Sequence, residues 1–470
     1  MGIYVNDTIC AISTASGTGA IAVIRLSGER SHEIALSVFR KKTGALNIND
    51  IKDYKAYFGE VFDPKSEDNS MVDEVLVTFF KNPHSYTGED SVEISCHGSV
   101  YVQQRILELL VNQGARLAGP GEFSKRAFIN GKFDLTQAEA VADLISSQNE
   151  ASHRIAVNQL KGGFSKELRE LRARLLDLTS LLELELDFSE EDVEFAGRTQ
   201  LREILDESLR HIGKLTDSFR LGNAIKNGIP VAIAGETNAG KSTLLNAILG
   251  EERAIVSDIE GTTRDTIEET FNINGTLYRF IDTAGIRETS ETIEKIGIER
   301  TFRKISEADI ILGVLDLTKG YENVCKSADL IISKIDSRKQ TLLLVGNKHD
   351  LAASFPVAKL QESYHNIPLA FISAKDTTDI ETLKSLIINH SNIHKLTSNE
   401  ALVTNARHYE ALVHAAQSLR HVHEGMDMNL SADLLAEDLK QGLYHLGSIT
   451  GEVTNDEVLG NIFGRFCVGK

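Results

Sequence analysis

The stretch Val231–Asn246, VAIAGETNAGKSTLLN, decides the fold of this chain. Its first four residues are apolar or small and predict a buried strand, the next eight fit the pattern G-x-x-x-x-G-K-[ST], and Thr243–Leu249 predicts an apolar helix. This order is typical of a phosphate site, because glycines turn backbone N–H groups inward and a helix start attracts an anion. Lys241 is expected to reach the outer phosphates, and the Ser242 hydroxyl to bind Mg²⁺.

Three further motifs follow in chain order, each at the predicted end of a strand. Asp282-Thr-Ala-Gly285 can hold Mg²⁺ through water and approach the γ-phosphate, and Ser373-Ala374-Lys375 can support a base through backbone N–H groups. In Asn347-Lys348-His349-Asp350, the carboxylate of Asp350 can accept hydrogen bonds from N1 and the exocyclic amine of guanine. Adenine offers no such pair of donors, so the four motifs together predict a GTP site.

A fifth motif, Gly261-Thr-Thr-Arg-Asp265, lies between the first two. The hydroxyl of Thr263 is expected to complete the Mg²⁺ shell when this loop closes over the γ-phosphate. Arg264 and Lys241 are candidates for catalysis. The residues expected to bind GTP are Asn238, Ala239, Gly240, Lys241, Ser242, Thr243, Ser257, Asp258, Ile259, Glu260, Gly261, Thr262, Thr263, Asp282, Thr283, Ala284, Gly285, Asn347, Lys348, Asp350, Ser373, Ala374 and Lys375.

Position 286 carries isoleucine, where Ras-type GTPases place the glutamine that orients the attacking water. An isoleucine side chain has no group that orients water. Either the protein hydrolyses GTP poorly, or another group takes over the role of the glutamine. Glu288, Glu291 and Glu294 are candidates in the segment that follows.

Bulk properties restrict the class of protein. A chain of 470 residues predicts two or three domains, and 41% hydrophobic with 25% charged residues is typical of a globular protein. No apolar run is long enough to span a membrane, and no secretory signal is evident. The four cysteines form no C-x-x-C pair, which favours a reducing cytoplasm. A net charge of −18 argues against a protein that coats nucleic acid, although a local basic patch for RNA stays open.

The pattern along the chain predicts an α/β and all-α multidomain protein. Residues 1–132 are expected to form an N-terminal α/β domain, and residues 133–221 and 386–470 a helical domain interrupted by a Ras-like P-loop GTPase domain at 222–385. A capping box at Thr136-Gln-Ala-Glu139 is expected to open the first helix of the helical domain. A leucine stripe from Leu168 to Leu182 follows in a helix-forming stretch that extends to about Arg220. The acidic segment Glu183–Glu194 is expected to interrupt that stretch as a solvated loop or helix end.

With these residues in view, the whole chain resembles the MnmE (TrmE) family of tRNA-modification GTPases, within the TrmE-Era-EngA-YihA-Septin-like GTPases. The resemblance lies in GTTRD, DTAGIRETSETIEKIGIER, YTGEDSVEISCHG, PGEFSKRAFINGKFDLTQAEA, VTNARHYEAL, LLAEDLKQGL and TGEVTNDEVLGNIFGRFCVGK. It implies a cytoplasmic homodimer formed through the N-terminal domain and no membrane attachment. With the FAD-dependent partner MnmG (GidA), such proteins add an aminomethyl or carboxymethylaminomethyl group to C5 of the wobble uridine of certain tRNAs.

The resemblance also implies two sets of ligands. A 5-formyltetrahydrofolate-type cofactor would be bound by Arg25, Glu93 and Lys132, with Lys470 reaching in from the C-terminus near Cys467, whose role stays open between chemistry and packing. A potassium ion would pair two GTPase domains across their active sites, with Glu294 orienting the attacking water through a bridging water. The potassium ligands would be Asn238, Ser257, Ile259 and Thr262. Thr237 departs from the family pattern, which has proline there, and is expected to alter the stiffness of the loop.

One alternative of a different class is a GTPase that assembles ribosomes as an RNA-binding switch. Such proteins share the GTTRD and D-T-A-G segments but usually append a basic RNA-binding domain. The C-terminal segment here is helical and acidic, which favours the tRNA-modifying GTPase. A membrane-linked GTPase channel is a further alternative, but this sequence lacks the hydrophobic spans that such a channel needs.

Overall fold

The computed structural model describes residues 7–44, 46–68, 70–187, 198–250, 269–281, 308–391, 402–454, 456–464 and 466–469. Its contacts divide the chain into two compact units. The first comprises residues 1–142, 159–195 and 430–470, and the second comprises residues 143–158 and 196–429. The domain boundaries drawn from the sequence, after residues 132, 221 and 385, stay predictions.

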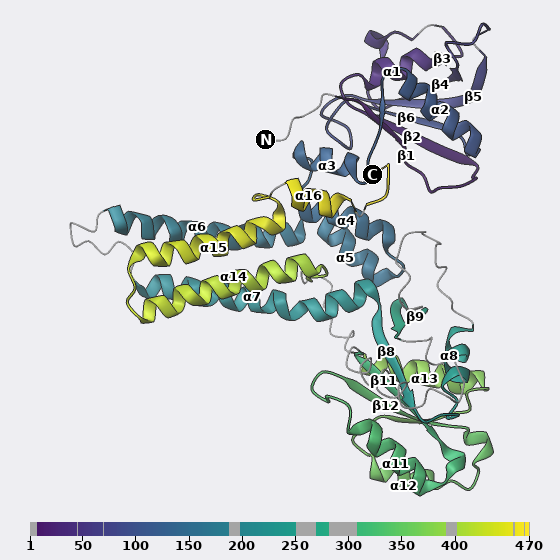
Figure 1. Ribbon diagram of the computed structural model, residues 1–470, viewed down its shortest axis with the longest axis vertical. Helices are drawn as coiled ribbons and strands as arrows, with labels where there is room; N and C mark the ends of the chain where they lie inside the picture. The colour runs from purple at the N-terminus through teal and green to yellow at the C-terminus, as the bar shows by residue number, and fades with distance from the viewer. Residues whose placement is uncertain are drawn as a thin grey trace. The chain divides into compact units, whose positions relative to one another are not determined.

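The first unit contains a seven-stranded sheet with the order β3-β4-β5-β6-β2-β1-β7 (Figure 1). Helices α1 (Ser31–Val38) and α2 (Val100–Asn112) pack on one face, where alternate residues such as Ile24, Val77 and Ile94 are buried. The core of the domain therefore lies between this face and the two helices. The strands are β1 (Ile9–Ile12), β2 (Ile21–Ser27), β3 (Phe39–Lys41), β4 (Lys55–Phe62), β5 (Met71–Phe80), β6 (Ser91–His97) and β7 (Arg116–Leu117).

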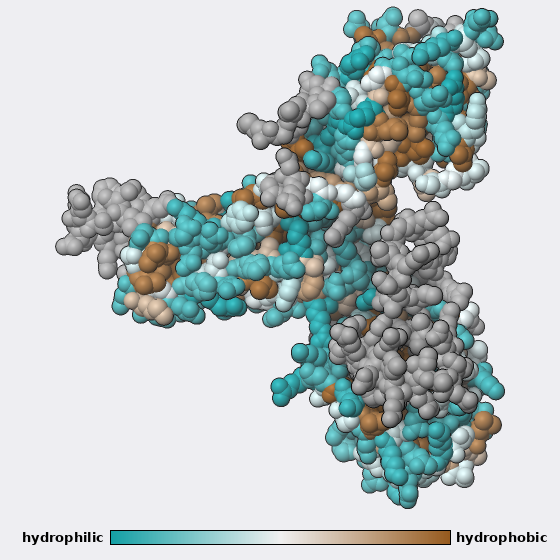
Figure 2. All heavy atoms as spheres, viewed as in Figure 1, coloured by the Kyte–Doolittle hydropathy of each residue, from teal (hydrophilic) through white to brown (hydrophobic). Residues whose placement is uncertain are grey.

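The opposite face of this sheet carries apolar side chains that stay exposed. Strand residues alternate between the two faces, so the neighbours of buried positions project away from α1 and α2. Ile21, Phe58 and Leu76 do so and are 68, 49 and 45% exposed. Figure 2 shows hydrophobic residues at the surface of this domain. A sheet face of this kind is a candidate for covering by another protein surface.

Long helices form the rest of the first unit and flank the inserted domain in the second. In the first unit α6 (Gly163–Asp187) packs against α15 (Ala432–Thr450), and in the second α7 (Arg198–Asn227) packs against α14 (Ala406–Asp427) (Figure 1). Because α7 precedes the inserted domain and α14 follows it, the helical region pairs across the insertion. This arrangement confirms the predicted fold class. The shorter helices are α3 (Glu122–Ile129), α4 (Leu135–Ser146), α5 (Glu150–Leu160) and α16 (Asp456–Phe463).

The leucine stripe of α6 behaves as predicted, whereas the acidic segment after it does so only in part. All five leucines of the stripe are buried, which explains the packing of α6 on α15. The helix continues to Asp187, so the first acidic residues belong to it and do not interrupt it. Residues 188–197 lie outside the described part of the chain. The stripe is Leu168, Leu171, Leu175, Leu178 and Leu182.

The cap of helix α4 lies two residues before the predicted one. The backbone N–H of Gln137 donates to Asp134 Oδ1, and the backbone N–H of Asp134 donates to Gln137 Oε1, each over 3.0 Å. These reciprocal bonds are a capping box made by Asp134 and Gln137. Thr136 is instead buried, and its hydroxyl lies 2.6 Å from that of Ser165. The predicted capping box at Thr136 and Glu139 is therefore wrong, because Asp134 reaches the free N–H group first.

The inserted domain is a six-stranded sheet with the order β13-β12-β11-β8-β10-β9, parallel except at β9. Helices α8 (Lys241–Leu249) and α13 (Thr377–His390) bury their apolar residues against one face, and α11 (Tyr321–Ile332) and α12 (Val357–Ser363) against the other. A parallel sheet covered on both faces brings its loops together at the carboxyl ends of the strands. The strands are β8 (Ile229–Gly235), β9 (Glu269–Ile273), β10 (Thr276–Phe280), β11 (Ile310–Asp316), β12 (Thr341–Asn347) and β13 (Leu369–Phe371).

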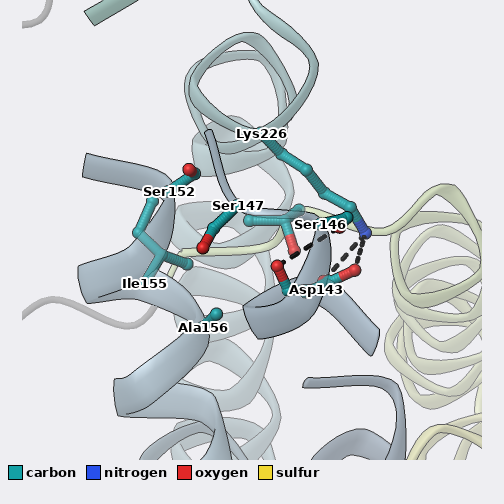
Figure 3. Close-up of a pocket in the computed structure, with 8 residues that line it drawn as sticks. Asp143, Ser146, Ser147, Ser152, Ile155, Ala156 and Lys226 are labelled. Atoms are coloured by element: carbon teal, nitrogen blue, oxygen red, sulfur yellow. Dashed lines mark hydrogen bonds and ion pairs between the residues drawn. The ribbon is translucent and has the colours of Figure 1, made fainter. Parts of the chain in front are cut away.

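An ion pair anchors the point where α7 leads into strand β8. Lys226, in the last turn of α7, lies 2.7 Å from Asp143 of α4, beside a small pocket that Ser146 and Ser147 also line (Figure 3). Both side chains are partly exposed, so the pair contributes only about 0.2–1 kcal/mol. Its position matters more than its strength, because β8 begins at Ile229 and ends in the phosphate loop.

Candidate functional site

The loop between β8 and α8 has the backbone that the phosphate motif requires. Gly235 has φ +152° and Gly240 has φ +94°, conformations that glycine adopts without strain. A Cβ atom at Gly235 would lie 2.4 Å from the carbonyl oxygen of Val314, and one at Gly240 would lie 2.2 Å from Asn347 Nδ2. Both glycines are therefore needed for the loop to close against its neighbours, and the N-terminus of α8, which favours an anion, follows the loop directly.

Lys241 and Ser242 begin helix α8, as expected for groups that bind phosphate and Mg²⁺. Lys241 Nζ donates to the carbonyl oxygens of Gly235 and Glu236, each over 2.8 Å, so the ammonium lies inside the loop. Burial lowers the pKa of Lys241, although Glu236 acts in the opposite direction. A phosphate group in the loop would favour the charged ammonium. Ser242 offers a hydroxyl oxygen, the hard type of ligand that Mg²⁺ prefers.

Asn347 and Lys348 connect the phosphate loop to the loops that are predicted to bind the base. The Asn347 side chain is 2% exposed; its Nδ2 donates to the carbonyl oxygen of Ala239 over 2.8 Å, and its Oδ1 accepts from the N–H of Ala374 over 3.1 Å. Lys348 Nζ donates to the carbonyl oxygen of Asn238 over 2.8 Å. Asn347 thus holds three loops of the predicted site together at the carboxyl edge of the sheet.

The groups predicted to recognise guanine lie at the same edge, where the N–H of His349 donates to the carbonyl oxygen of Ile372 over 3.1 Å. Asp350 is exposed, so its carboxylate is open to a ligand, whereas Ser373 and Ala374 are buried. The N–H of Ser373 donates to Asp379 Oδ2 over 2.7 Å. That bond ties the start of the Ser373–Lys375 loop to the first turn of α13.

Two acidic residues of this site are absent from the sequence motifs. Asp379 fixes the loop at Ser373, and Asp316, at the end of β11, lies 2.7 Å from Lys348 Nζ. A residue's place at the end of a predicted parallel strand is a signal for Asp316, because such ends meet at one edge. No comparable signal points to Asp379, which lies within the first turn of a helix.

Many of the predicted residues lie outside the described part of the chain, so their roles stay predictions. They belong to the segments around Gly261–Asp265, Asp282–Gly285 and Glu294, and to the last residue of the chain. These residues are Ser257, Asp258, Ile259, Glu260, Gly261, Thr262, Thr263, Arg264, Asp282, Thr283, Ala284, Gly285, Ile286, Glu288, Glu291, Glu294 and Lys470.

A second candidate site lies on the N-terminal sheet. Arg25 of β2 and Glu93 of β6 are directly opposite each other across the two antiparallel strands. Arg25 Nε and Nη2 both donate to Glu93 Oε1, over 3.0 and 2.7 Å, so this bonding leaves Oε2 unused. The Arg25 guanidinium also lies 5.1 Å from the ring centre of Tyr86 and 5.8 Å from that of Phe123. Charged groups beside aromatic rings suit a flat heterocyclic ligand.

Lys132 is linked to Tyr86 through the next residue in the chain. The Tyr86 ring is 5.9 Å from the ring of Phe133, the residue after Lys132, and Lys132 Nζ donates to the carbonyl oxygen of Pro83 over 2.9 Å. Tyr86 therefore connects the neighbourhood of Lys132 with that of Arg25. No direct contact joins Lys132 to Arg25 or Glu93 among the contacts of the described residues.

The C-terminal segment docks on the same domain. Pro120 and Val468 form an isolated β-bridge, and the hydroxyl of Ser13 donates to the carbonyl oxygen of Gly469 over 3.0 Å. A Cβ at Gly469 would lie 2.1 Å from the carbonyl oxygen of Ile12, so only glycine permits this approach. The carbonyl oxygen of Cys467 accepts from the N–H of Gly121 over 3.3 Å, and Cys467 is exposed. The tail thus ends against the strand that neighbours β2.

Comparison with known proteins shows the family to which this chain belongs. A family model described as GTP-binding protein TrmE N-terminus matches residues 8–132, and one described as MnmE helical domain matches residues 135–467. The chain belongs to the MnmE family of tRNA modification GTPases. The tRNA modification GTPase MnmE of Bacteroides thetaiotaomicron is 50% identical over 99% of this chain and 100% of its own length. That of Parabacteroides distasonis is 51% identical, again over 99% of this chain and 100% of its own length.

Membership of the MnmE family confirms the family resemblance seen in the sequence and the predicted enzyme class, a GTPase acting in tRNA modification. A solved FeoB G-domain from Methanococcus jannaschii is 27% identical and covers 34% of this chain and 96% of that chain, at a TM-score of 0.26 that carries no further argument. Within the described ranges, no helix is both long and apolar enough to cross a membrane.

Proposed function

We propose that this MnmE-family GTPase works with the FAD-dependent partner MnmG to modify the wobble uridine of certain tRNAs. The product would be an aminomethyl or carboxymethylaminomethyl group on carbon 5. Family membership over the full chain supports the tRNA and the GTP. The observation that carries the one-carbon step is the Arg25–Glu93 pair beside Tyr86 and Phe123, with the C-terminal segment docked on the same domain.

The residues of this second site fit a 5-formyltetrahydrofolate-type cofactor, which would supply the one-carbon unit. Glu93 retains a carboxylate oxygen that Arg25 does not use, and such an oxygen suits the amino groups of a pterin. Arg25 and Lys132 are cations that suit the ring carbonyl or the glutamate tail. Lys470 follows the docked Gly469 directly in sequence, which supports its assignment to the same ligand.

We assign Mg²⁺ and a monovalent cation to the nucleotide site, where Ser242 and Asn238 are the predicted ligands within the described residues. Ser242 and Thr263 would hold Mg²⁺. Asn238 is exposed and has φ +64°, so its amide extends from the loop and away from the buried core. Together with Ser257, Ile259 and Thr262 it would hold K⁺, whose charge would stabilise the transition state where an arginine finger acts in other GTPases. Glu294 would orient the attacking water.

We assign dimerisation of the whole protein to residues 1–132. The support is the exposed apolar face of the N-terminal sheet, which carries Ile21, Phe58 and Leu76. A second copy of this domain would cover that face and remove the apolar residues from water, at about 25 cal/mol for each Å² buried. The face also carries Arg25 and Glu93, so dimerisation would enclose the proposed folate site.

Nucleoside analysis of tRNA tests this function. In cells that lack the gene, mass spectrometry of digested tRNA should show no aminomethyl-type modification of C5 of uridine, and the wild-type gene should restore it. Glu93→Gln should fail to restore it, because the amide lacks the negative charge that the pterin amino groups require. Glu108→Gln on the exposed surface of α2 is the matched control and should restore it. Modified uridine that persists without the gene contradicts the proposal.

A further inference from the structure

Asp316 is a buried carboxylate whose role no sequence motif records. Its side chain is only 5% exposed. Oδ1 accepts from the backbone N–H of Thr318 over 3.0 Å and from its hydroxyl over 2.6 Å, and Oδ2 accepts from Lys348 Nζ over 2.7 Å. Burial raises the pKa of this carboxyl, but the bonds from Lys348 and Thr318 outweigh that effect and hold the pKa below its ordinary value. Asp316 is therefore a fixed negative charge at the end of β11.

Lys348, the partner of Asp316, also contacts the phosphate loop. Lys348 Nζ also donates to the carbonyl oxygen of Asn238 over 2.8 Å, so a chain of two bonds joins Asp316 to Asn238. Asn238 has the left-handed conformation, φ +64°, which costs free energy for a residue other than glycine. A bond to its carbonyl oxygen helps to hold that conformation, and with it the direction in which the Asn238 side chain leaves the backbone.

The neighbouring bond limits what Asp316 can affect. Asn347 Nδ2 holds the carbonyl oxygen of Ala239, the next residue of the loop, without help from Asp316. The loop therefore keeps one anchor to β12 when the Asp316–Lys348 bond is removed. Loss of the Asp316–Lys348 bond therefore affects Asn238. It also leaves the positive charge of Lys348 without its carboxylate partner next to Asn238, and that charge repels a cation bound there.

We propose that Asp316 is a positioning residue for the monovalent cation. Through Lys348 it fixes the backbone of Asn238, from which the amide reaches the ion, and it neutralises the lysine charge next to that ion. This inference rests on the proposed potassium-dependent activation. It differs from a general role in nucleotide binding, because it predicts that the response to K⁺ changes while affinity for guanine nucleotide is nearly kept.

The test compares Asp316→Asn with the wild-type protein. GTP turnover is measured against KCl concentration at saturating Mg²⁺–GTP, with ionic strength kept constant by N-methylglucamine chloride. Affinity is measured separately with a fluorescent GDP analogue in buffer without K⁺. The half-activating K⁺ concentration should rise about tenfold, the usual effect of losing one charge-assisted hydrogen bond, while nucleotide affinity changes by less than about threefold.

Two further variants separate positioning from general damage. Asp316→Glu keeps the charge and should restore part of the response to K⁺. Lys319→Met is the matched control, because Lys319 makes a 2.8 Å ion pair with Glu236 of the same loop but does not contact Asn238. It should leave the K⁺ response unchanged. If Asp316→Asn does not fold, Thr318→Val, which removes the hydroxyl bond to Oδ1, should shift the response in the same direction by a smaller factor.

The outcomes distinguish this inference from the proposed function. If the wild-type protein responds to K⁺ and the folded Asp316 variant responds identically, the positioning role is wrong and potassium activation stands. If nucleotide affinity falls in parallel with the K⁺ response, Asp316 serves nucleotide binding in general and the inference is overturned. If the wild-type protein does not respond to K⁺, potassium activation itself fails, and the inference fails with it.

Discussion

Replacing Glu294 with alanine should leave GTP binding intact and slow GTP hydrolysis by about 100-fold or more, the usual effect of losing a group that positions or activates a reacting water. The physical reason is Ile286, which stands where a glutamine would orient the water and has no polar group. Glu294 is the residue that the family resemblance assigns to this task. A single-turnover assay with γ-labelled GTP measures the chemical step apart from product release.

Controls for this variant come from the same segment. Glu288→Ala and Glu291→Ala remove a carboxylate from neighbouring positions and should reduce hydrolysis much less than Glu294→Ala. Affinity for a non-hydrolysable GTP analogue should be equal in all four proteins. Normal single-turnover rates in the Glu294 variant would remove that assignment, and a large loss in either control variant would transfer the role to that residue.

Replacing Asp350 with alanine should weaken binding of GTP and GDP by about 10- to 100-fold, because the donors of guanine lose their charged acceptor. Asp350→Asn should lose guanine in the same way but gain xanthosine nucleotides, since the amide donates to the carbonyl oxygen that replaces the exocyclic amine. The structure is consistent with this assignment, because Asp350 is exposed and the residue before it, His349, donates its N–H to Ile372, the residue before Ser373. Equilibrium titration with fluorescent GDP and XDP analogues measures both effects.

Glu362→Gln, on the exposed surface of α12, is the control for the Asp350 variants and should bind GDP as the wild type does. Inosine nucleotides, which lack the exocyclic amine, should bind the wild-type protein more weakly than guanosine nucleotides. An Asp350→Asn protein that still prefers GDP to XDP would show that another group recognises the base.

The nucleotide site could be predicted from the sequence because its residues belong to motifs with fixed spacing. Gly235, Gly240, Lys241 and Asn347 each lie where the order of strands and loops requires, and the structure adds the contacts between them. Asp316 carries no motif letter. Its role depends on two strand ends meeting across the sheet, which becomes visible only when β11 and β12 are placed side by side.

Less of the N-terminal site could be predicted from the residues themselves. The ion pair of Arg25 and Glu93 depends on the register of β2 against β6. Helix α1 and strands β3, β4 and β5 lie between these two strands in the chain, so their register cannot be read from alternation alone. The capping error at Thr136 has a local cause. Two overlapping patterns, D-x-x-Q and T-x-x-E, compete for one helix start, and the side chain that reaches the first free N–H group makes the cap.

GTP turnover by the purified full-length protein, compared in KCl and NaCl at equal ionic strength, tests the central claim most directly. The account predicts turnover that is at least about tenfold faster in KCl, because one ion of the right size would replace the charge of an arginine finger. Equal rates in the two salts would contradict it.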